Sequence, residues 1–180
     1  MILVGDAQQV AGAKLDYAVD FADVLGAATL SSAAWATISG LTNLGDSTAG
    51  ATALVRYTSA TVGAIYLANV AATLSTGEIV IAAFRLEIVT RIIVQDLTMA
   101  VGAVKILDKL PWTPYLGGDT IASRSWSSSG AGLTITSGGT TATPKVTAVS
   151  AGTWYATEHI VTTSGQEDER SIAIVVRGLT

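Results

Sequence analysis

Hydrophobic and polar residues alternate at every second position in the clearest stretches of this sequence. In the run 84–89, Phe84, Leu86 and Ile88 alternate with the charged Arg85 and Glu87. A period of two places the apolar set on one face of a β-strand and the charged pair on the other. The sequence therefore predicts a half-buried strand here, with Phe84, Leu86 and Ile88 pointing inward.

A second run near the end of the chain, 170–177, has the same period. Ile172, Ile174 and Val176 fall on one face, and smaller residues occupy the other. This run and 84–89 each predict the strand that closes one half of the chain.

Further short runs rich in Thr, Val, Ile and aromatic residues are typical of strands. We expect strands at 54–57, 66–73, 134–136, 145–149 and 155–162. Turn signals lie between them at 45–47, 75–77, 137–139 and 164–165. About seven short strands in 90 residues indicate an all-β fold of the immunoglobulin-like or fibronectin-like sandwich type.

Two segments also fit a helix, 7–24 and 92–110. Because Val19 and Phe21 alternate at a period of two, we predict a strand at 15–21. The run 92–94 then reads as the first strand of a second domain. We expect two domains, 1–90 and 91–180, joined near Thr90 with almost no linker.

The two halves repeat one another. The segment 25–32, followed by Trp35, returns as 116–123, followed by Trp126, at a spacing of 91 residues. Weaker matches pair 40–42 with 132–134, 63–66 with 152–155, and 75–77 with 163–165. A repeat of this length has the size of one small sandwich, which predicts a tandem duplicate.

Composition limits the function classes. The net charge is −4, and the ten basic residues are scattered singly, which is unlike a nucleic-acid-binding surface. Charged residues make up 13% of the chain, and the longest apolar run is far too short for a membrane span. No basic leader precedes the first residues, so we expect no signal peptide. Such a surface favours a permanent subunit of a larger assembly.

Candidate chemistry is sparse. His159 is the single histidine, and its neighbour Glu158 points to the opposite face of the predicted strand, so the two do not form a simple pair. The chain has no cysteine, which excludes thiolate catalysis and Cys-based zinc sites. We expect no catalytic, cofactor-binding or metal-ligating residues, no cofactor, and no enzyme activity.

Two acidic clusters fit a metal site poorly. Asp16, Asp20 and Asp23 match no calcium-loop spacing, and residues 167–169 are three consecutive acids that cannot all face one ion. We interpret both clusters as solvated acids in turns.

Four tryptophans divide into two pairs. Trp35 and Trp126 occupy matching positions and are predicted to pack one sheet on the other. Trp112 and Trp154 fall where the first half has Phe21 and Ile65, which also favours a packing role. The alternative is a carbohydrate-stacking surface, which requires an exposed Trp112 or Trp154.

The second half resembles a family of small immunoglobulin-like virion proteins of tailed bacteriophages, often described as fibre–tail adaptors. The resemblance rests on 112–126 with 132–134, and on 151–155 with 160–172. The first half resembles the family loosely: 14–21 keeps a Leu-Asp-Tyr strand, while Glu78-Ile79-Val80 replaces the acidic turn.

This resemblance implies a non-enzymatic structural protein of the virion, assembled in the host cytoplasm. It would act as an adaptor in the neck or tail and attach a fibre, spike or adjacent ring through sheet edges and loops. Its partners would be other virion proteins and further copies of itself, with no nucleic acid and no membrane. Two alternatives stay open, a capsid decoration protein and a glycan-binding adhesion module.

Overall fold

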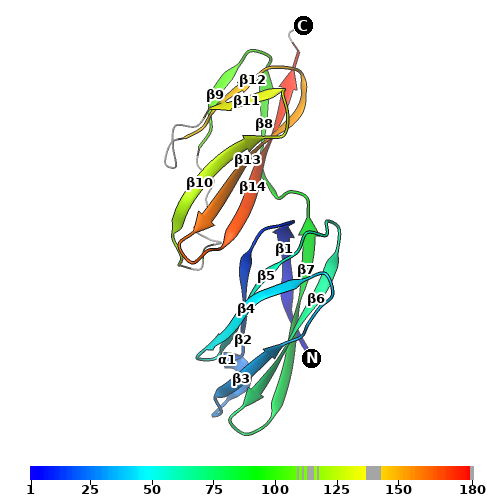
Figure 1. Cartoon of the computed structure of the whole chain (residues 1–180), viewed down its shortest axis with the longest axis vertical. Helices are drawn as coiled ribbons and strands as arrows, with labels where there is room; N and C mark the ends of the chain where they lie inside the picture. Colours follow the sequence, from blue (N-terminus) through cyan, green and yellow to red (C-terminus); the bar gives the residue numbers. More distant parts are fainter. Residues whose placement is uncertain (109, 111, 113–115, 117, 137–142, 179–180) are drawn as a thin grey trace. The chain divides into compact units, whose positions relative to one another are not determined.

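The computed structural model describes residues 1–108, 110, 112, 116, 118–136 and 143–178. The chain divides into two compact units, Met1–Thr90 and Arg91–Thr180. Each unit is built almost entirely from strands, which form two facing sheets (Figure 1). No helix among the described residues is long and apolar enough to cross a membrane.

The first unit has seven strands and one helical turn. One sheet has the order β1-β7-β6-β3 and the other β2-β5-β4. The elements are β1 (Ile2–Val10), β2 (Leu15–Asp20), α1 (Ala22–Leu25), β3 (Leu30–Trp35), β4 (Thr42–Ala49), β5 (Thr52–Thr58), β6 (Ile65–Leu74) and β7 (Ile79–Val89).

The described part of the second unit repeats this plan with seven strands. Its sheets have the orders β8-β14-β13-β10 and β9-β12-β11. The strands are β8 (Ile93–Ala100), β9 (Val104–Ile106), β10 (Ile121–Ser128), β11 (Leu133–Thr136), β12 (Lys145–Ala148), β13 (Gly152–Thr162) and β14 (Glu167–Arg177).

Strand order and pairing confirm the fold class, two tandem immunoglobulin-like sandwiches. In both units the first strand pairs in parallel with the last, and the other pairings are antiparallel. Each first strand also carries a bulge at its start, since pairing skips from Leu3 to Gly5 and from Ile93 to Gln95. A shared irregularity of this kind supports the duplication seen in the sequence.

Alternating residues of the facing sheets fill the core of each unit. In β7, Phe84, Leu86 and Ile88 are buried, while Arg85 and Glu87 on the other face are half-buried. The predicted inward set is therefore confirmed. In β14, Ile172, Ile174 and Val176 belong to the core of the second unit in the same way.

The other predicted strands are also confirmed, with shifts of a few residues at their ends. The predicted 54–57, 66–73, 134–136, 145–149 and 155–162 lie in β5, β6, β11, β12 and β13. The strand predicted at 15–21 is β2, and 92–94 overlaps the start of β8. The turn signals at 75–77 and 164–165 fall between paired strands, whereas 137–139 lies outside the described residues.

The turn predicted at 45–47 is wrong, because these residues lie inside β4. Pairing with β5 skips from Asn43 to Gly45, which forms a bulge. Asn43 accepts a hydrogen bond from the Gly45 amide at 2.8 Å and donates one to Asp46 at 2.9 Å. The turn-forming residues thus shape a bulge within the strand.

The helical alternative for 7–24 is also wrong, apart from the single turn α1. The sequence pattern missed β1 because its first residues, from Ile2 to Asp6, are exposed on both faces. A strand without a buried face has no alternation to detect.

Candidate interaction surfaces

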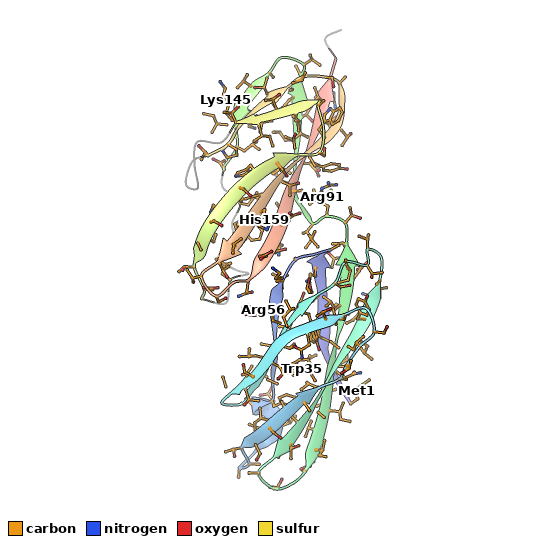
Figure 2. The ribbon with its side chains drawn as sticks, in the orientation of Figure 1. Met1, Trp35, Arg56, Arg91, Lys145 and His159 are labelled. Atoms are coloured by element: carbon orange, nitrogen blue, oxygen red, sulfur yellow. The ribbon has the colours of Figure 1, made fainter. Side chains whose placement is uncertain are left out.

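The structure separates the residues that sequence patterns had grouped as possible sites. His159 lies on β13 (Figure 2), where it is half-buried and pairs in register with Glu169. Its neighbour Glu158 is fully buried on the inner face. The described residues contain no group of three His, Asp or Glu side chains that could hold a metal ion.

The first acidic cluster is divided among three roles. Asp16 forms a two-pronged ion pair with Arg56 across β2 and β5, with Nε–Oδ1 and Nη2–Oδ2 distances of 2.6 and 2.8 Å. Asp20 accepts a hydrogen bond from the Ala22 amide at 2.9 Å, and Asp23 lies in the first turn of α1. These carboxylates therefore do not converge on one ion.

The second acidic cluster alternates between faces of β14. Asp168 points inward and is buried, whereas Glu167 and Glu169 are half-buried on the outer face. Arg170 donates to the Asp168 carboxylate from Nε and Nη2, each at 3.1 Å. Burial raises the pKa of Asp168, although Arg170 opposes this effect.

Sequence reasoning missed the role of Glu158, a buried carboxylate that accepts three hydrogen bonds. It has no exposed surface, and its Oε1 accepts a hydrogen bond from Arg124 Nη1 at 2.7 Å. Its Oε2 accepts hydrogen bonds from Trp112 Nε1 at 2.8 Å and from the Leu110 amide at 3.3 Å. Glu158 thus fastens Leu110 and Trp112 to the sheet.

This buried cluster extends to a second cation. The guanidinium of Arg170 lies over the Trp112 ring, 5.4 Å from its centroid, and Arg170 pairs in register with Glu158. We define the ionic core cluster as Trp112, Arg124, Glu158, Asp168 and Arg170. Glu158 shares its inward face with Ala156 and Ile160, so strand alternation was the signal that could have found it.

The same positions in the first unit are apolar. Because the two sheets share their register, Glu158 corresponds to Val70, and Arg170 and Asp168 correspond to Ala82 and Val80. Arg124 corresponds to Ala33. The ionic core cluster is therefore a property of the second unit alone.

Asp119 organises the turn between β13 and β14. It accepts hydrogen bonds from the Thr163 hydroxyl, from the Ser164 hydroxyl at 2.6 Å, and from the Thr120 amide at 2.8 Å. Side-chain donors from Ser164, Thr162 and Thr163 hold the pKa of Asp119 well below its usual range. The 91-residue spacing places Ala28 at this position in the first unit.

The core of the first unit has polar atoms of a different kind. The Tyr57 hydroxyl and Trp35 Nε1 are buried and have no hydrogen-bond partner among the described residues. Burial, assisted by the charge of Asp46, raises the pKa of Tyr57 to about 12. The rings of Trp35 and Tyr57 meet edge to face, 6.1 Å apart.

The tryptophans pack as predicted, with one correction. Trp112 is 2% exposed, and Trp35 and Trp126 are partly buried against the two cores. The assignment of Trp154 to the position of Ile65 is wrong by one residue. When the strand pairings of the two units are aligned, Ile65 is equivalent to Thr153, and Tyr66 is equivalent to Trp154.

Trp154 and Tyr66 then occupy equivalent places. Tyr66 donates a hydrogen bond to the Gly40 carbonyl at 3.0 Å, while the Trp154 ring covers Gly130 and Gly132 so closely that a Cβ on Gly132 would overlap it. Trp154 Nε1 donates to the Ser150 carbonyl at 3.0 Å. Because Trp112 is buried, it cannot stack on a glycan, and Trp154 is the one candidate left for that alternative.

The outer face of β1-β7-β6-β3 in the first unit is apolar over part of its length. Register places Ile81 beside Ala71, and Ala71 beside Ala34, with Ala83 beside Leu3 in a neighbouring row. Leu3 and Ile79 are each 62% exposed, and Ile81 is 45% exposed. We call Leu3, Ala34, Ala71, Ile79, Ile81 and Ala83 the apolar face.

The matching face of the second unit is polar. Glu167 and Glu169 replace Ile79 and Ile81, and His159 replaces Ala71. The Thr157 and Ser171 hydroxyls lie 2.8 Å apart on the same face. Arg91 lies over the Tyr155 ring, 4.0 Å from its centroid.

Sheet edges are the remaining surfaces open to a partner. Each sheet is open, so β1 and β3 border one sheet of the first unit, and β8 and β10 border the matching sheet of the second. An open edge strand presents unpaired backbone groups to which a further strand can add. A shallow depression lined by Asp16, Leu44, Asp46 and Arg56 lies over the other sheet of the first unit.

Fold and surfaces together define a class: a tandem immunoglobulin-like chain whose two similar units present different outer faces. Within this class, the second unit matches a family model described as podophage GP4 fiber-tail adaptor protein gp77, over residues 108–175. This match confirms the resemblance of the second half; it covers less than half of the chain. No curated protein sequence matches the chain.

Three of the solved structures similar to this chain illustrate the likeness. Tandem Ig repeats of Dlar show 12% identity and a TM-score of 0.34, covering 97% of this chain and 95% of that one. Fibronectin(III)-like modules of Clostridium thermocellum CbhA show 13% identity and a TM-score of 0.32, covering 97% and 91%. The PKD domain from KIAA 1837 protein shows 16% identity and a TM-score of 0.38, covering 48% and 83%. Scores this low carry no argument about function.

Proposed function

We propose that this chain is a structural virion protein of a tailed bacteriophage that acts as an adaptor in the neck or tail. The single observation that carries the proposal is the match of residues 108–175 to the fibre-tail adaptor family. Its partners are then a fibre, a spike or an adjacent ring, and it contacts them through sheet edges, loops and the outer sheet faces. The virion is its site of action, and the host cytoplasm its place of assembly.

The two units are proposed as two domains with separate roles. Residues 91–180 contain the segment that matches the adaptor family, so we assign them the contact typical of that family. Residues 1–90 have an apolar outer face where the second unit is polar, which suits a different neighbour. An adaptor needs two dissimilar contacts, and a duplicated chain with diverged surfaces supplies them.

We also propose that the chain is not an enzyme. The side chains with the strongest interactions are engaged in structural roles: Glu158 holds a chain segment, and Asp119 holds a turn. His159 lies on a sheet face across from Glu169, and among the described residues no Ser or Thr hydroxyl forms a hydrogen bond with it that would support a catalytic assignment.

Removal of the protein from the virion tests the adaptor role. In particles assembled by a phage with a stop codon in this gene, we expect filled heads and negative-stain images that lack fibres, spikes or a complete neck. Supplying the chain from a plasmid should restore them. Particles with intact tails and fibres but fragile heads would contradict the proposal and favour a capsid decoration protein.

A further inference from the structure

We propose that the apolar face of the first unit is the contact surface for a second copy of this chain, packed face to face about a two-fold axis. The inference deepens the proposed assembly function and rests on it. The partner is a second copy of the chain, and the contact surface is the outer side of the sheet β1-β7-β6-β3.

The apolar face is not required by the fold. The second unit has the same strand order and register, yet it has Glu167, His159 and Glu169 where the first has Ile79, Ala71 and Ile81. A sandwich of this design therefore tolerates charged side chains at these positions. Isoleucines that are 62% and 45% exposed at positions compatible with glutamate call for a role outside the unit.

The shape of the face suits packing against itself. Large side chains, Leu3, Ile79 and Ile81, stand around a floor of small ones, Ala34, Ala71 and Ala83. Two polar side chains, Asn69 beside Ala83 and Thr73 beside Ile79, interrupt the floor. Two such sheets can pack with the large side chains of each copy over the small residues of the other. A two-fold contact requires a self-complementary surface of this kind.

The charges bordering the face favour the same partner. The next rows along the strands contain Asp6, Arg85 and Glu87, with Arg85 Nη1 4.0 Å from Asp6 Oδ1. A border with both signs can match itself after a two-fold rotation, since Arg85 of one copy can meet an acid of the other. The matching face of the second unit has two half-buried acids, Glu167 and Glu169, which would repel in a homotypic contact.

Sedimentation of the full chain tests the inference. We expect the wild-type chain to form a dimer, and the double variant Ile79→Glu/Ile81→Glu to weaken dimerisation by roughly a hundredfold or more. Glu169→Lys changes charge at the position equivalent to Ile81 and should leave the dimer intact. Circular dichroism should show that both variants keep the strand content of the wild type.

A cross-linking experiment gives a second measurement with milder changes. The chain has no cysteine, so Ala71→Cys and His159→Cys each introduce one thiol at equivalent positions. With a short bis-maleimide, we expect Ala71→Cys to form cross-linked dimers and His159→Cys to remain monomeric.

A monomeric wild-type chain at all concentrations would overturn the inference, as would a dimer that survives the glutamate substitutions. Equal loss of dimer in Glu169→Lys would also overturn it, because the contact would then not be specific to the first unit. None of these results would alter the phenotype of particles that lack the chain. Failure of this inference is therefore distinguishable from failure of the proposed function.

Discussion

The two units fold to one plan but use opposite chemistry at the same interior position. Val70 in β6 and Glu158 in β13 are both completely buried, and each pairs with the equivalent residue of the last strand. Around Val70 the neighbours are apolar, whereas Glu158 has Arg124 and Trp112 as hydrogen-bond partners. A sandwich core thus accepts a buried carboxylate when every oxygen is matched by a donor.

The comparison also shows what the buried charge contributes. An apolar side chain at this position stabilises without directional contacts, while Glu158 fixes the chain at Leu110 and Trp112. Buried ionic groups are poor sources of stability, and specificity is their best-attested use. We infer that the ionic core cluster holds Leu110 and Trp112 in one position on the sheet.

Placing the carboxylate in the wrong unit should have the largest effect. Val70→Glu buries an acid in the core of the first unit, where Ala33 and Ala82 stand in place of the two arginines of the ionic core cluster. By analogy with an unpaired buried charge, this costs about 3–5 kcal/mol. We expect the first unit to lose its calorimetric transition while the second unit keeps its own. Val70→Ile serves as a control for size, and normal unfolding of the glutamate variant would contradict the comparison.

Replacing the carboxylate of the second unit by an apolar side chain should lower the free energy of unfolding by slightly less. Glu158→Val leaves Arg124, which is 20% exposed, and Trp112 Nε1 without their acceptor, for a loss of about 3 kcal/mol. Adding Arg124→Ala should recover part of that loss, because the double variant approaches the apolar arrangement of the first unit. Chemical denaturation measures both, and additive losses would show that the two residues do not interact.

Acid stability should differ between the units because of Asp119. Its pKa is depressed in the folded state, so its contribution is present above the unfolded value, about 3.9, and disappears as pH falls through the folded pKa. The raised pKa of Asp168 acts in the opposite sense. Asp119→Asn should flatten the pH dependence of the second unit below about pH 5. The first unit, with Ala28 at this position, is the internal reference in a melting series, and an unchanged profile would contradict this role.

The smallest effect is expected at the exposed ion pair of the first unit. Asp16→Asn should cost less than about 1 kcal/mol, because the Asp16 side chain is 36% exposed and solvent screens the pair. Salt titration of the melting temperature should show the loss shrinking as ionic strength rises. A cost equal to that of Glu158→Val would remove the distinction between exposed and buried pairs.

The sequence predicted most of the strands because their inner faces are regular. Phe84, Leu86 and Ile88 alternate with charges, so both the strand and its direction of burial could be recognised. Tandem duplication was visible because Trp35 and Trp126 each follow a similar segment, 91 residues apart. The start of β1 was invisible because its residues are exposed on both faces.

Interior chemistry escaped prediction for a different reason. Glu158 stands at a position where alternation requires an apolar residue, and its partners Trp112 and Arg124 lie 46 and 34 residues away along the chain. Their proximity depends on strand register, which local sequence does not specify. The same dependence explains the one-residue error at Trp154, whose true counterpart is Tyr66.

Cryo-electron microscopy of intact virions tests most directly whether the two units contact different neighbours. We expect density for this chain in a ring at the neck or tail, with residues 1–90 and 91–180 contacting different surroundings. Copies distributed over the capsid shell, or particles without the chain, would contradict the adaptor role.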